Sequence, residues 1–337
     1  MNDATPIHQA SNAAATASMA ISARGLAKSF GDLRAVDGID LDVPRGMIFA
    51  ILGPNGAGKT TLMRMLATLS RPDAGSATVM GHDLLQSPHE VRSSIAMTGQ
   101  FASLDEDLTG RENLVLLARL WGFRGRAAKG RADDLLEAFG LSDAAAKQVK
   151  NYSGGMRRRL DIAASLIVTP GVLFLDEPTT GLDPNARKDV WRMIRGLAVS
   201  GVTILLTTQY LDEADQLAAR IAVIDHGKKI AEGTSRELKA ATGSGFLHIS
   251  LADPARLDEA AGILERRLGQ SVQRGAEGAQ LSVLGSTAKA ANEALAELIA
   301  SDIELSDFSM GQPSLDEVFF ALTGQPGSAE TRKDDAA

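Results

Sequence analysis

Hydrophobic residues along the chain fall into short unbroken runs that are separated by segments with helical spacing. Two of these runs, residues 49–52 and 172–175, contain only apolar side chains, as is typical of strands buried on both faces of a parallel sheet. From residue 22 to about residue 240 such strands alternate with helical segments. This rhythm predicts an α/β fold in which helices cover a parallel sheet.

The strand signals fade between about residues 101 and 165. In that stretch the periodicity predicts three helices, at residues 111–121, 127–139 and 156–168. Thr109 and Glu112 have the spacing of a capping box, which marks the start of the first helix. We therefore expect a helical subdomain, at about residues 101–165, inserted in the sheet domain.

A different pattern of strands and helices begins after about residue 244. The predicted elements are strands at 246–251, 279–284 and 303–310, and helices at 255–268 and 288–299. This order predicts a small separate α/β domain with a split βαβ layer. A second capping box, at Ser314 and Glu317, precedes a short helix whose apolar face contains Leu315, Val318, Phe319 and Leu322.

These patterns predict the domain organisation of the whole chain. The predicted regions are a disordered tail at 1–20, a larger α/β domain at 21–242, a small C-terminal α/β domain at 245–324 and a disordered tail at 325–337.

Composition limits the class of protein. The chain has 337 residues, of which 44% are hydrophobic and 23% charged, and no apolar stretch approaches the roughly 20 residues of a membrane-spanning helix. The formal net charge of -7 argues against nucleic acid as a partner, and we expect none. Cysteine is absent from the sequence, which excludes disulfides and cysteine nucleophiles.

A run of three arginines is the local exception to the acidic balance. We interpret Arg157, Arg158 and Arg159 as a solvated helix face, with a contact to nucleotide, lipid or a partner as the alternative. The five histidines show no metal-ligand spacing, and we assign them no catalytic function.

A glycine-rich loop follows the first buried run. It reads Gly53, Pro54, Asn55, Gly56, Ala57, Gly58, Lys59 and Thr60. This is the spacing of a phosphate-binding loop, in which backbone N–H groups and the start of a helix bind phosphate oxygens. We expect Lys59 to bridge the β- and γ-phosphates, Thr60 to bind magnesium and Thr61 to make a further phosphate contact.

Two acids follow the second buried run. Asp176 is placed to hold magnesium, and Glu177 is placed to orient and deprotonate an attacking water. Phosphoryl transfer depends mainly on positioning and charge neutralisation, so these groups suffice for hydrolysis. A strand end that merely exposes two acids to solvent is the alternative. Together with the glycine loop, the pair predicts a nucleoside triphosphatase.

A Ser-Gly-Gly run lies between these two elements in the sequence. Ser153, Gly154, Gly155 and Met156 open a predicted helix, so their amides form a second anion site at its N-terminus. Ser153 also has the chemistry of an N-cap.

In this order and at this spacing, the three elements resemble those of the ATP-binding cassette (ABC) family, and the resemblance covers residues 22 to about 240. The resemblance implies that residues 21–242 form a nucleotide-binding domain, a P-loop ATPase domain with an inserted helical subdomain. It also implies that the Ser-Gly-Gly loop of one subunit closes over ATP held by another. It also assigns Phe30 to adenine stacking, Gln100 to magnesium and water, and Asp183 to the dimer contact. A buried core position for Phe30 and a surface amide for Gln100 are the alternatives.

Gln209 departs from the family pattern, which usually has a histidine after this strand, in contact with the γ-phosphate. A glutamine amide can donate a hydrogen bond to phosphate, but it cannot exchange a proton near neutrality. We expect hydrolysis with Glu177 as its central residue, assisted by Lys59, Gln100 and Gln209. An ATP-binding regulatory protein without turnover is an open alternative.

Three longer runs, at residues 151–164, 207–215 and 314–324, resemble the daunorubicin-resistance type of exporter ATPase, as does the glutamine at position 209. The resemblance implies ATP and Mg²⁺ as cofactors, a dimer of two copies and a separate transmembrane permease. It implies a peripheral subunit at the cytoplasmic face of the cell membrane that powers the export of a drug or other lipophilic compound. A non-transport ABC ATPase acting on nucleic acid or ribosomes is the alternative.

Overall fold

The chain forms two compact units in the computed structural model, Met1–Glu232 and Gly233–Ala337. The structure describes residues 19–98, 104–241, 246–275, 279–284, 288–311, 314–315 and 317–319. The sequence predicts a domain boundary after residue 242, whereas the contacts assign helix α9 (Ser235–Ala241) to the second unit. Strand β1 begins at Met19, two positions inside the predicted tail at residues 1–20. The predicted tail at 325–337 lies outside the described residues.

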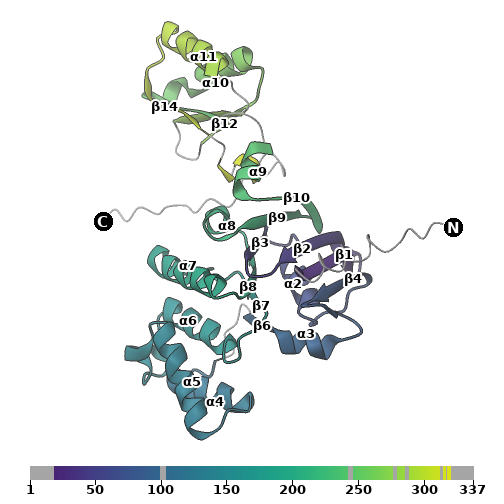
Figure 1. The fold of residues 1–337 in the computed structure, drawn as a ribbon. Helices are drawn as coiled ribbons and strands as arrows, with labels where there is room; N and C mark the ends of the chain where they lie inside the picture. Colours follow the sequence, from purple (N-terminus) through teal and green to yellow (C-terminus); the bar gives the residue numbers. More distant parts are fainter. Residues whose placement is uncertain are drawn as a thin grey trace, which may run out of the picture. The chain divides into compact units, whose positions relative to one another are not determined.

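A six-stranded sheet forms the centre of the first unit, in the order β10-β9-β3-β8-β7-β6 (Figure 1). Its strands are β3 (Ile48–Leu52), β6 (Ile95–Thr98), β7 (Val172–Asp176), β8 (Thr203–Thr208), β9 (Arg220–Asp225) and β10 (Lys228–Gly233). Strand β3 pairs in parallel with β8 and β9, and β7 pairs in parallel with β6 and β8. Every residue of β3 and β7 is buried, so the prediction of two fully buried parallel strands is confirmed.

A second, antiparallel sheet in the first unit was not predicted from the sequence. Its order is β2-β1-β4-β5, with β1 (Met19–Phe30), β2 (Leu33–Pro44), β4 (Ala74–Val79) and β5 (His82–Asp83). Only Gly31 and Asp32 separate β1 from β2, and Gly31 has a φ of 58°. A connection this short can join only antiparallel neighbours. The prediction of one parallel sheet for the whole region is therefore wrong at its N-terminal end.

The two sheets share a hydrophobic core with helix α2 (Lys59–Leu66). Buried side chains of β1 and β2, such as Leu26 and Leu41, belong to the same cluster as Phe49 of β3 and Phe174 of β7. Leu62 and other apolar residues of α2 complete the cluster. The helix that follows the glycine loop is thus fixed on its apolar side.

Helices fill the segment that was predicted to be a helical subdomain. They are α4 (Gly110–Leu120), α5 (Gly125–Ala138) and α6 (Gly154–Ser165), and they lie together in Figure 1. The capping box at Thr109 and Glu112 is confirmed, because the Thr109 side chain accepts from Glu112 N and the Glu112 side chain accepts from Thr109 N. The other α-helices that the structure describes in the first unit are α3 (Pro88–Ser94), α7 (Pro184–Val199) and α8 (Leu211–Leu217).

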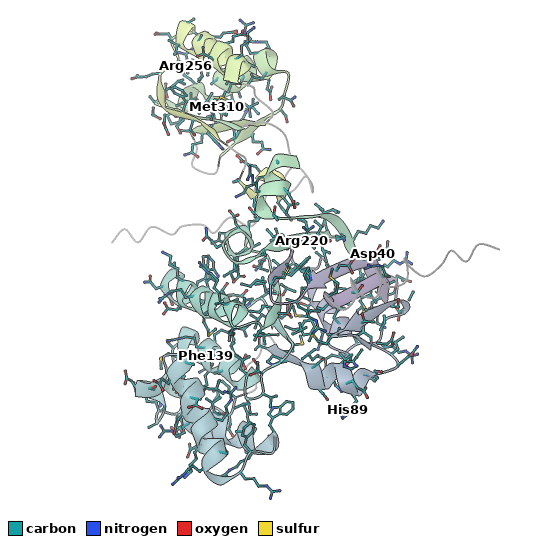
Figure 2. The ribbon with its side chains drawn as sticks, in the orientation of Figure 1. Asp40, His89, Phe139, Arg220, Arg256 and Met310 are labelled. Carbon is teal, nitrogen blue, oxygen red and sulfur yellow. The ribbon has the colours of Figure 1, made fainter. Side chains whose placement is uncertain are left out.

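The second unit contains an antiparallel sheet in the order β12-β13-β11-β14. Its elements are β11 (Phe246–Leu251), α10 (Leu257–Leu268), β12 (Val272–Arg274), β13 (Gln280–Leu284), α11 (Ala288–Ala300) and β14 (Leu305–Gly311). The split βαβ arrangement is confirmed, although the short strand β12 was missed. Figure 2 labels Arg256, just before α10, and Met310 on β14.

The end of the described chain carries the second predicted capping box. Ser314 N donates to Glu317 Oε2 at 2.7 Å, and Glu317 N donates to Ser314 Oγ at 3.3 Å. Leu315, Val318 and Phe319 are buried as predicted, while Leu322 lies outside the described residues. Among the helices that the structure describes, none is both long enough and apolar enough to cross a membrane.

Candidate functional site

The glycine loop lies at the carboxyl end of β3, between Leu52 and Lys59. Gly58 has a φ of 100°, and a Cβ atom there would lie 2.1 Å from Ala35 O. A Cβ atom at Gly53 would lie 2.2 Å from Ile224 O. Neither distance is possible for a side chain, so the neighbouring backbone requires glycine at both positions. The loop consequently presents its backbone, rather than side chains, at the start of α2.

The start of α2 supplies hydrogen-bond donors. The first intrahelical bond runs from Leu62 N to Gly58 O at 2.9 Å, so the amides of residues 59–61 precede the hydrogen-bond ladder of the helix. These N–H groups and the positive end of the helix dipole favour an anion at this position. The arrangement therefore fits the phosphate oxygens of a nucleotide.

Lys59 is the buried cation of the site. Its side chain is only 4% exposed, and Nζ donates to Gly53 O at 2.8 Å and to Pro54 O at 3.0 Å. Nζ also lies 3.6 Å from Glu177 Oε1. Burial lowers the pKa of Lys59, and the charge of Glu177 opposes this shift. The ammonium group is thus held against the loop by two carbonyls.

Asp176 ends β7 beside the first turn of α2. Its Oδ1 accepts hydrogen bonds from Thr60 Oγ1 at 3.1 Å and from Thr207 Oγ1 at 2.5 Å. Oxygen atoms of this kind are the ligands that magnesium prefers, so the carboxylate of Asp176 and the hydroxyl of Thr60 fit that ion. Thr207, a buried hydroxyl near the end of β8 (Thr203–Thr208), was not among the predicted site residues.

Glu177 has a backbone conformation that is rare outside glycine. Its φ is 46°, and its N–H donates to Thr207 Oγ1 at 3.0 Å. The side chain is 10% exposed, and Oε2 accepts from Thr180 Oγ1 at 3.2 Å. Strained backbone of this kind costs free energy and is common at functional sites. The alternative of a strand end that exposes two acids to solvent is wrong, because Asp176 is buried and Glu177 nearly so.

A cavity of about 310 Å³ lies beside the loop. The residues that line it are Phe30, Leu33, Ala35, Asn55, Gly56, Ala57, Gly58, Lys59, Thr60, Thr61 and Glu177. Phe30 is 55% exposed, and Lys28 Nζ lies 5.6 Å from the centre of its ring. The alternative of a core phenylalanine is therefore wrong. The cavity unites most of the predicted nucleotide contacts with the predicted base, Glu177.

The Ser-Gly-Gly run begins α6, as the sequence analysis predicts. Ser153 is the N-cap, and its Oγ accepts from Met156 N at 3.3 Å. A Cβ atom at Gly155 would lie 2.8 Å from the Cβ of Ala186, so α6 and α7 approach closely there. At Gly154 a Cβ atom would lie 3.5 Å from Leu182 Cδ2, an ordinary contact. Packing within the chain thus accounts for Gly155 but not for Gly154.

Asp183 begins the neighbouring helix. It is the N-cap of α7, and its Oδ2 accepts from Asn185 N at 3.2 Å and from Ala186 N at 3.1 Å. The cap fixes the direction in which the loop after Glu177 enters the helix.

The interpretation of the arginine run as a solvated face is wrong. Arg158 is mostly buried, with its side chain 13% exposed. Its Nε donates to Pro178 O at 2.9 Å and one terminal nitrogen donates to Asp176 O at 3.2 Å. Arg159 donates to the carbonyl of Phe139, which Figure 2 labels at the end of α5. Arg158 thereby joins α6 to the end of β7, and only the positive charge of the run pointed to it in the sequence.

Of the two predicted glutamines, Gln209 is among the residues that the structure describes and Gln100 is not. Gln209 follows β8 directly and is partly buried. Gln100 lies outside the described residues, which end at Thr98 on β6 and resume at Leu104.

Comparisons with known proteins agree with this geometry. A family model described as ABC transporter matches residues 36–180. The chain is 54% identical over 317 residues to the daunorubicin/doxorubicin resistance ATP-binding protein DrrA of Streptomyces peucetius, covering 94% of this chain and 96% of that protein. It is 46% identical over 218 residues to the Nod factor export ATP-binding protein I of Ralstonia nicotianae, covering 65% and 68%. Among solved structures, the ADP conformation of MJ1267, an ATP-binding cassette of an ABC transporter, matches with a TM-score of 0.58 and 25% identity, covering 65% of this chain and 92% of that one.

Proposed function

The chain belongs to the ATP-binding cassette family of transport ATPases, and we propose that it powers the export of a drug or other lipophilic compound through a separate membrane permease. The observation that carries the proposal is the meeting of Lys59, Asp176 and Glu177 at the carboxyl ends of two parallel strands. Relatives that match nearly the whole chain are named for resistance to daunorubicin and doxorubicin, which supports a lipophilic drug as the cargo.

In this proposal ATP binds in the cavity beside the glycine loop. The backbone amides of the loop and of the first turn of α2 bind the phosphates, and Lys59 exchanges its two carbonyl contacts for the β- and γ-phosphates. Thr61 adds a further phosphate contact. The exposed ring of Phe30 stacks on the adenine.

Magnesium, when bound, neutralises charge on the β- and γ-phosphate oxygens. Thr60 and Asp176 would hold it, since their oxygen atoms already lie 3.1 Å apart. Gln100 is the third proposed ligand, from the segment outside the described residues.

Glu177 accepts the proton of the attacking water. Its left-handed backbone and the hydrogen bond from Thr180 fix the direction of the carboxylate, and Lys59 Nζ lies 3.6 Å from Oε1. Gln209 donates a hydrogen bond to the γ-phosphate and remains uncharged, so this site positions the phosphate without a titrating histidine.

A second copy of the chain completes each site. Ser153, Gly154, Gly155 and Met156 bind the γ-phosphate of ATP held by the partner, and Asp183 lies in the contact between the two copies. Closure excludes water, while hydrolysis and product release reopen the dimer. The permease keeps the chain at the cytoplasmic face of the cell membrane as a peripheral subunit.

The direct test is the ATPase rate of the purified chain, alone and with its candidate permease in lipid. Lys59→Ala and Glu177→Gln are expected to lower the magnesium-dependent rate by about 100- to 1,000-fold, and the permease to alter the rate of the unchanged chain. Lys129→Ala and Glu137→Gln, at exposed positions of α5, are the matched controls. An ATPase rate that is unchanged by the permease but raised by nucleic acid or ribosomes would contradict export. ATP binding without turnover would favour a regulatory protein.

A further inference from the structure

A buried carboxyl group lies outside the set of residues that contact the nucleotide. Glu213 belongs to the first turn of α8, and its relative exposure is 0%. Its Oε1 accepts hydrogen bonds from Thr179 Oγ1 at 2.8 Å and from Trp191 Nε1 at 3.0 Å. One carboxyl oxygen therefore joins α8 to the loop after β7 and to α7, through residues 34 and 22 positions earlier in the sequence.

Each of the three segments also carries a residue of the proposed site. Helix α8 begins two positions after Gln209. Thr179 lies in the loop that follows Glu177, and Trp191 lies on α7, whose N-cap is Asp183. A displacement at Gln209 would consequently act, through short buried hydrogen bonds, on the loop of the catalytic base and on the helix of the dimer contact.

A second set of contacts joins the same two helices. Arg187 of α7 is 5% exposed, and its guanidinium group lies 5.0 Å from the centre of the Tyr210 ring. The same group donates to Asp212 Oδ2 at 3.5 Å. Because Tyr210 and Asp212 adjoin Gln209 and Glu213, α7 and the segment after β8 are connected at two points.

The environment of Glu213 favours its neutral form. Burial raises the pKa of this carboxyl group. Its Oε2 atom is buried and has no hydrogen-bond partner within the part of the chain that the structure describes. A charged carboxylate in that position would be costly. A glutamine has nearly the same shape and keeps the acceptor oxygen for Thr179 and Trp191, so it is the conservative substitution.

We propose that Glu213 is a positioning residue that transmits the contact between Gln209 and the γ-phosphate to the loop of Glu177 and to α7. The inference rests on the proposed function, since it requires ATP at this site. It gives Glu213 no contact with the nucleotide. The proposal also explains how an uncharged residue at position 209 can replace the histidine of the family. Gln209 would displace the hydrogen-bonded Glu213 and would not need to transfer a proton.

Tryptophan fluorescence provides a readout that a purely structural residue would not affect. The sequence contains two tryptophans, of which Trp121 is 56% exposed and Trp191 is 7% exposed. Trp121→Phe leaves Trp191, which is bonded to Glu213, as the single reporter. We expect MgATP to change the emission of Trp191 in the full-length chain.

The variants separate transmission from folding. Thr179→Val and Glu213→Leu are expected to lower kcat about tenfold, because the first removes the bond between the loop of Glu177 and Glu213 and the second removes the acceptor of both Thr179 and Trp191. Glu213→Gln is expected to stay within about twofold. KM for ATP should change less than about twofold in all three, since neither residue lines the cavity. Both damaging variants should also remove the response of Trp191 to MgATP.

Thr203→Val is the matched control. Thr203 is a buried threonine at the other end of β8, where its Oγ1 accepts from Gly46 N at 3.0 Å. This variant loses a similar hydrogen bond, so its melting temperature should fall, but the fluorescence response and kcat of the folded protein should remain.

Unchanged kcat and an unchanged Trp191 response in Thr179→Val would overturn the inference. So would losses in that variant no larger than those in Thr203→Val. If Glu213→Leu fails to fold, Thr179→Val decides the question alone. Binding of a fluorescent ATP analogue to Lys59→Ala is measured alongside. If Lys59→Ala still binds the analogue, the proposed function is contradicted. If Lys59→Ala loses binding while Thr179→Val keeps its kcat and its Trp191 response, only the inference about Glu213 is contradicted.

Discussion

The loop after β3 and the loop before α6 both begin a helix with glycine, yet the chain constrains the two loops differently. Cβ atoms at Gly53 and Gly58 would lie 2.2 Å and 2.1 Å from backbone oxygens of the same chain. A Cβ atom at Gly154 would meet only a leucine methyl group, at an ordinary 3.5 Å. The fold itself thus requires glycine at positions 53 and 58. At position 154 packing within the chain would also accept a residue with a Cβ atom.

The charges around the two loops differ in the same way. Beside the first loop lie Lys59, Asp176 and Glu177, which are the groups that phosphoryl transfer requires. The second loop offers the N-terminus of α6 and the hydroxyl of Ser153, which caps that helix, and Gly154 lines a cavity with Arg157 and Arg158 of the same helix. The first loop thus contains the buried lysine and lies beside both acids, whereas the second presents backbone amides and a hydroxyl at a helix N-terminus, which suit an anion. This contrast is what favours a head-to-tail dimer.

The largest effect is expected where the two regions are joined, at Arg158. Arg158→Met should lower the free energy of unfolding by about 3 kcal/mol, because it removes hydrogen bonds to the end of β7 and leaves Asp161 buried without its cation. Urea denaturation measures the change. Arg126→Met, at an exposed position of α5, should change the free energy by less than about 0.5 kcal/mol. Equal stability of both variants would mean that Arg158 does not link the regions.

Gly58→Ala addresses the loop that the fold constrains. The substitution forces a side chain into a left-handed conformation and against Ala35 O, so the loop must shift. We expect the affinity for ATP to fall about 100-fold, which corresponds to about 2.7 kcal/mol. Titration with a fluorescent ATP analogue measures it. Unaltered affinity would show that the loop does not shape the phosphate site.

Gly154→Ala addresses the loop that the fold leaves open. Its melting temperature and its affinity for ATP should match those of the unchanged chain, because the added methyl group meets nothing closer than 3.5 Å. Steady-state hydrolysis should nevertheless fall about tenfold, since the methyl group displaces the nucleotide of the second copy. A fall in melting temperature large enough to explain the lower rate of hydrolysis would show that the fold constrains both loops.

The smallest expected effect concerns the adenine. Phe30→Ala should raise KM for ATP about fivefold, in keeping with the loss of one stacking contact of about 1 kcal/mol. The ring is 55% exposed, so stability should change little. Leu33→Ala, at a residue that lines the same cavity and is 67% exposed, is the control. An equal rise in KM for both variants would show that the ring of Phe30 does not stack specifically on the adenine.

The sequence predicted the parallel sheet because β3 and β7 are unbroken apolar runs, which have few other structural explanations. It missed the antiparallel sheet because β1 and β2 mix polar and apolar residues across several bulges. Register shifts of this kind destroy the strict alternation by which an isolated strand is recognised. The three-residue strand β12 was too short to leave any periodic signal.

Site residues were predictable where a backbone requirement fixes the residue type. Gly58 and Lys59 belong to a spacing that sequence alone can read. Arg158 and Glu213 were not recognised, because their importance depends on burial and on partners 18 to 34 positions away. A charge in a helical sequence has no visible partner until the fold supplies one.

The most direct test of the head-to-tail arrangement uses the absence of cysteine from the sequence. Chains carrying Asn55→Cys and chains carrying Ser153→Cys, both with Glu177→Gln to slow hydrolysis, are mixed and treated with a short bifunctional maleimide. We expect a cross-linked dimer of the two different chains that requires MgATP and disappears when Lys59→Ala is added to the Asn55→Cys chain. Equal cross-linking with and without nucleotide, or none when ATP is bound, would contradict it.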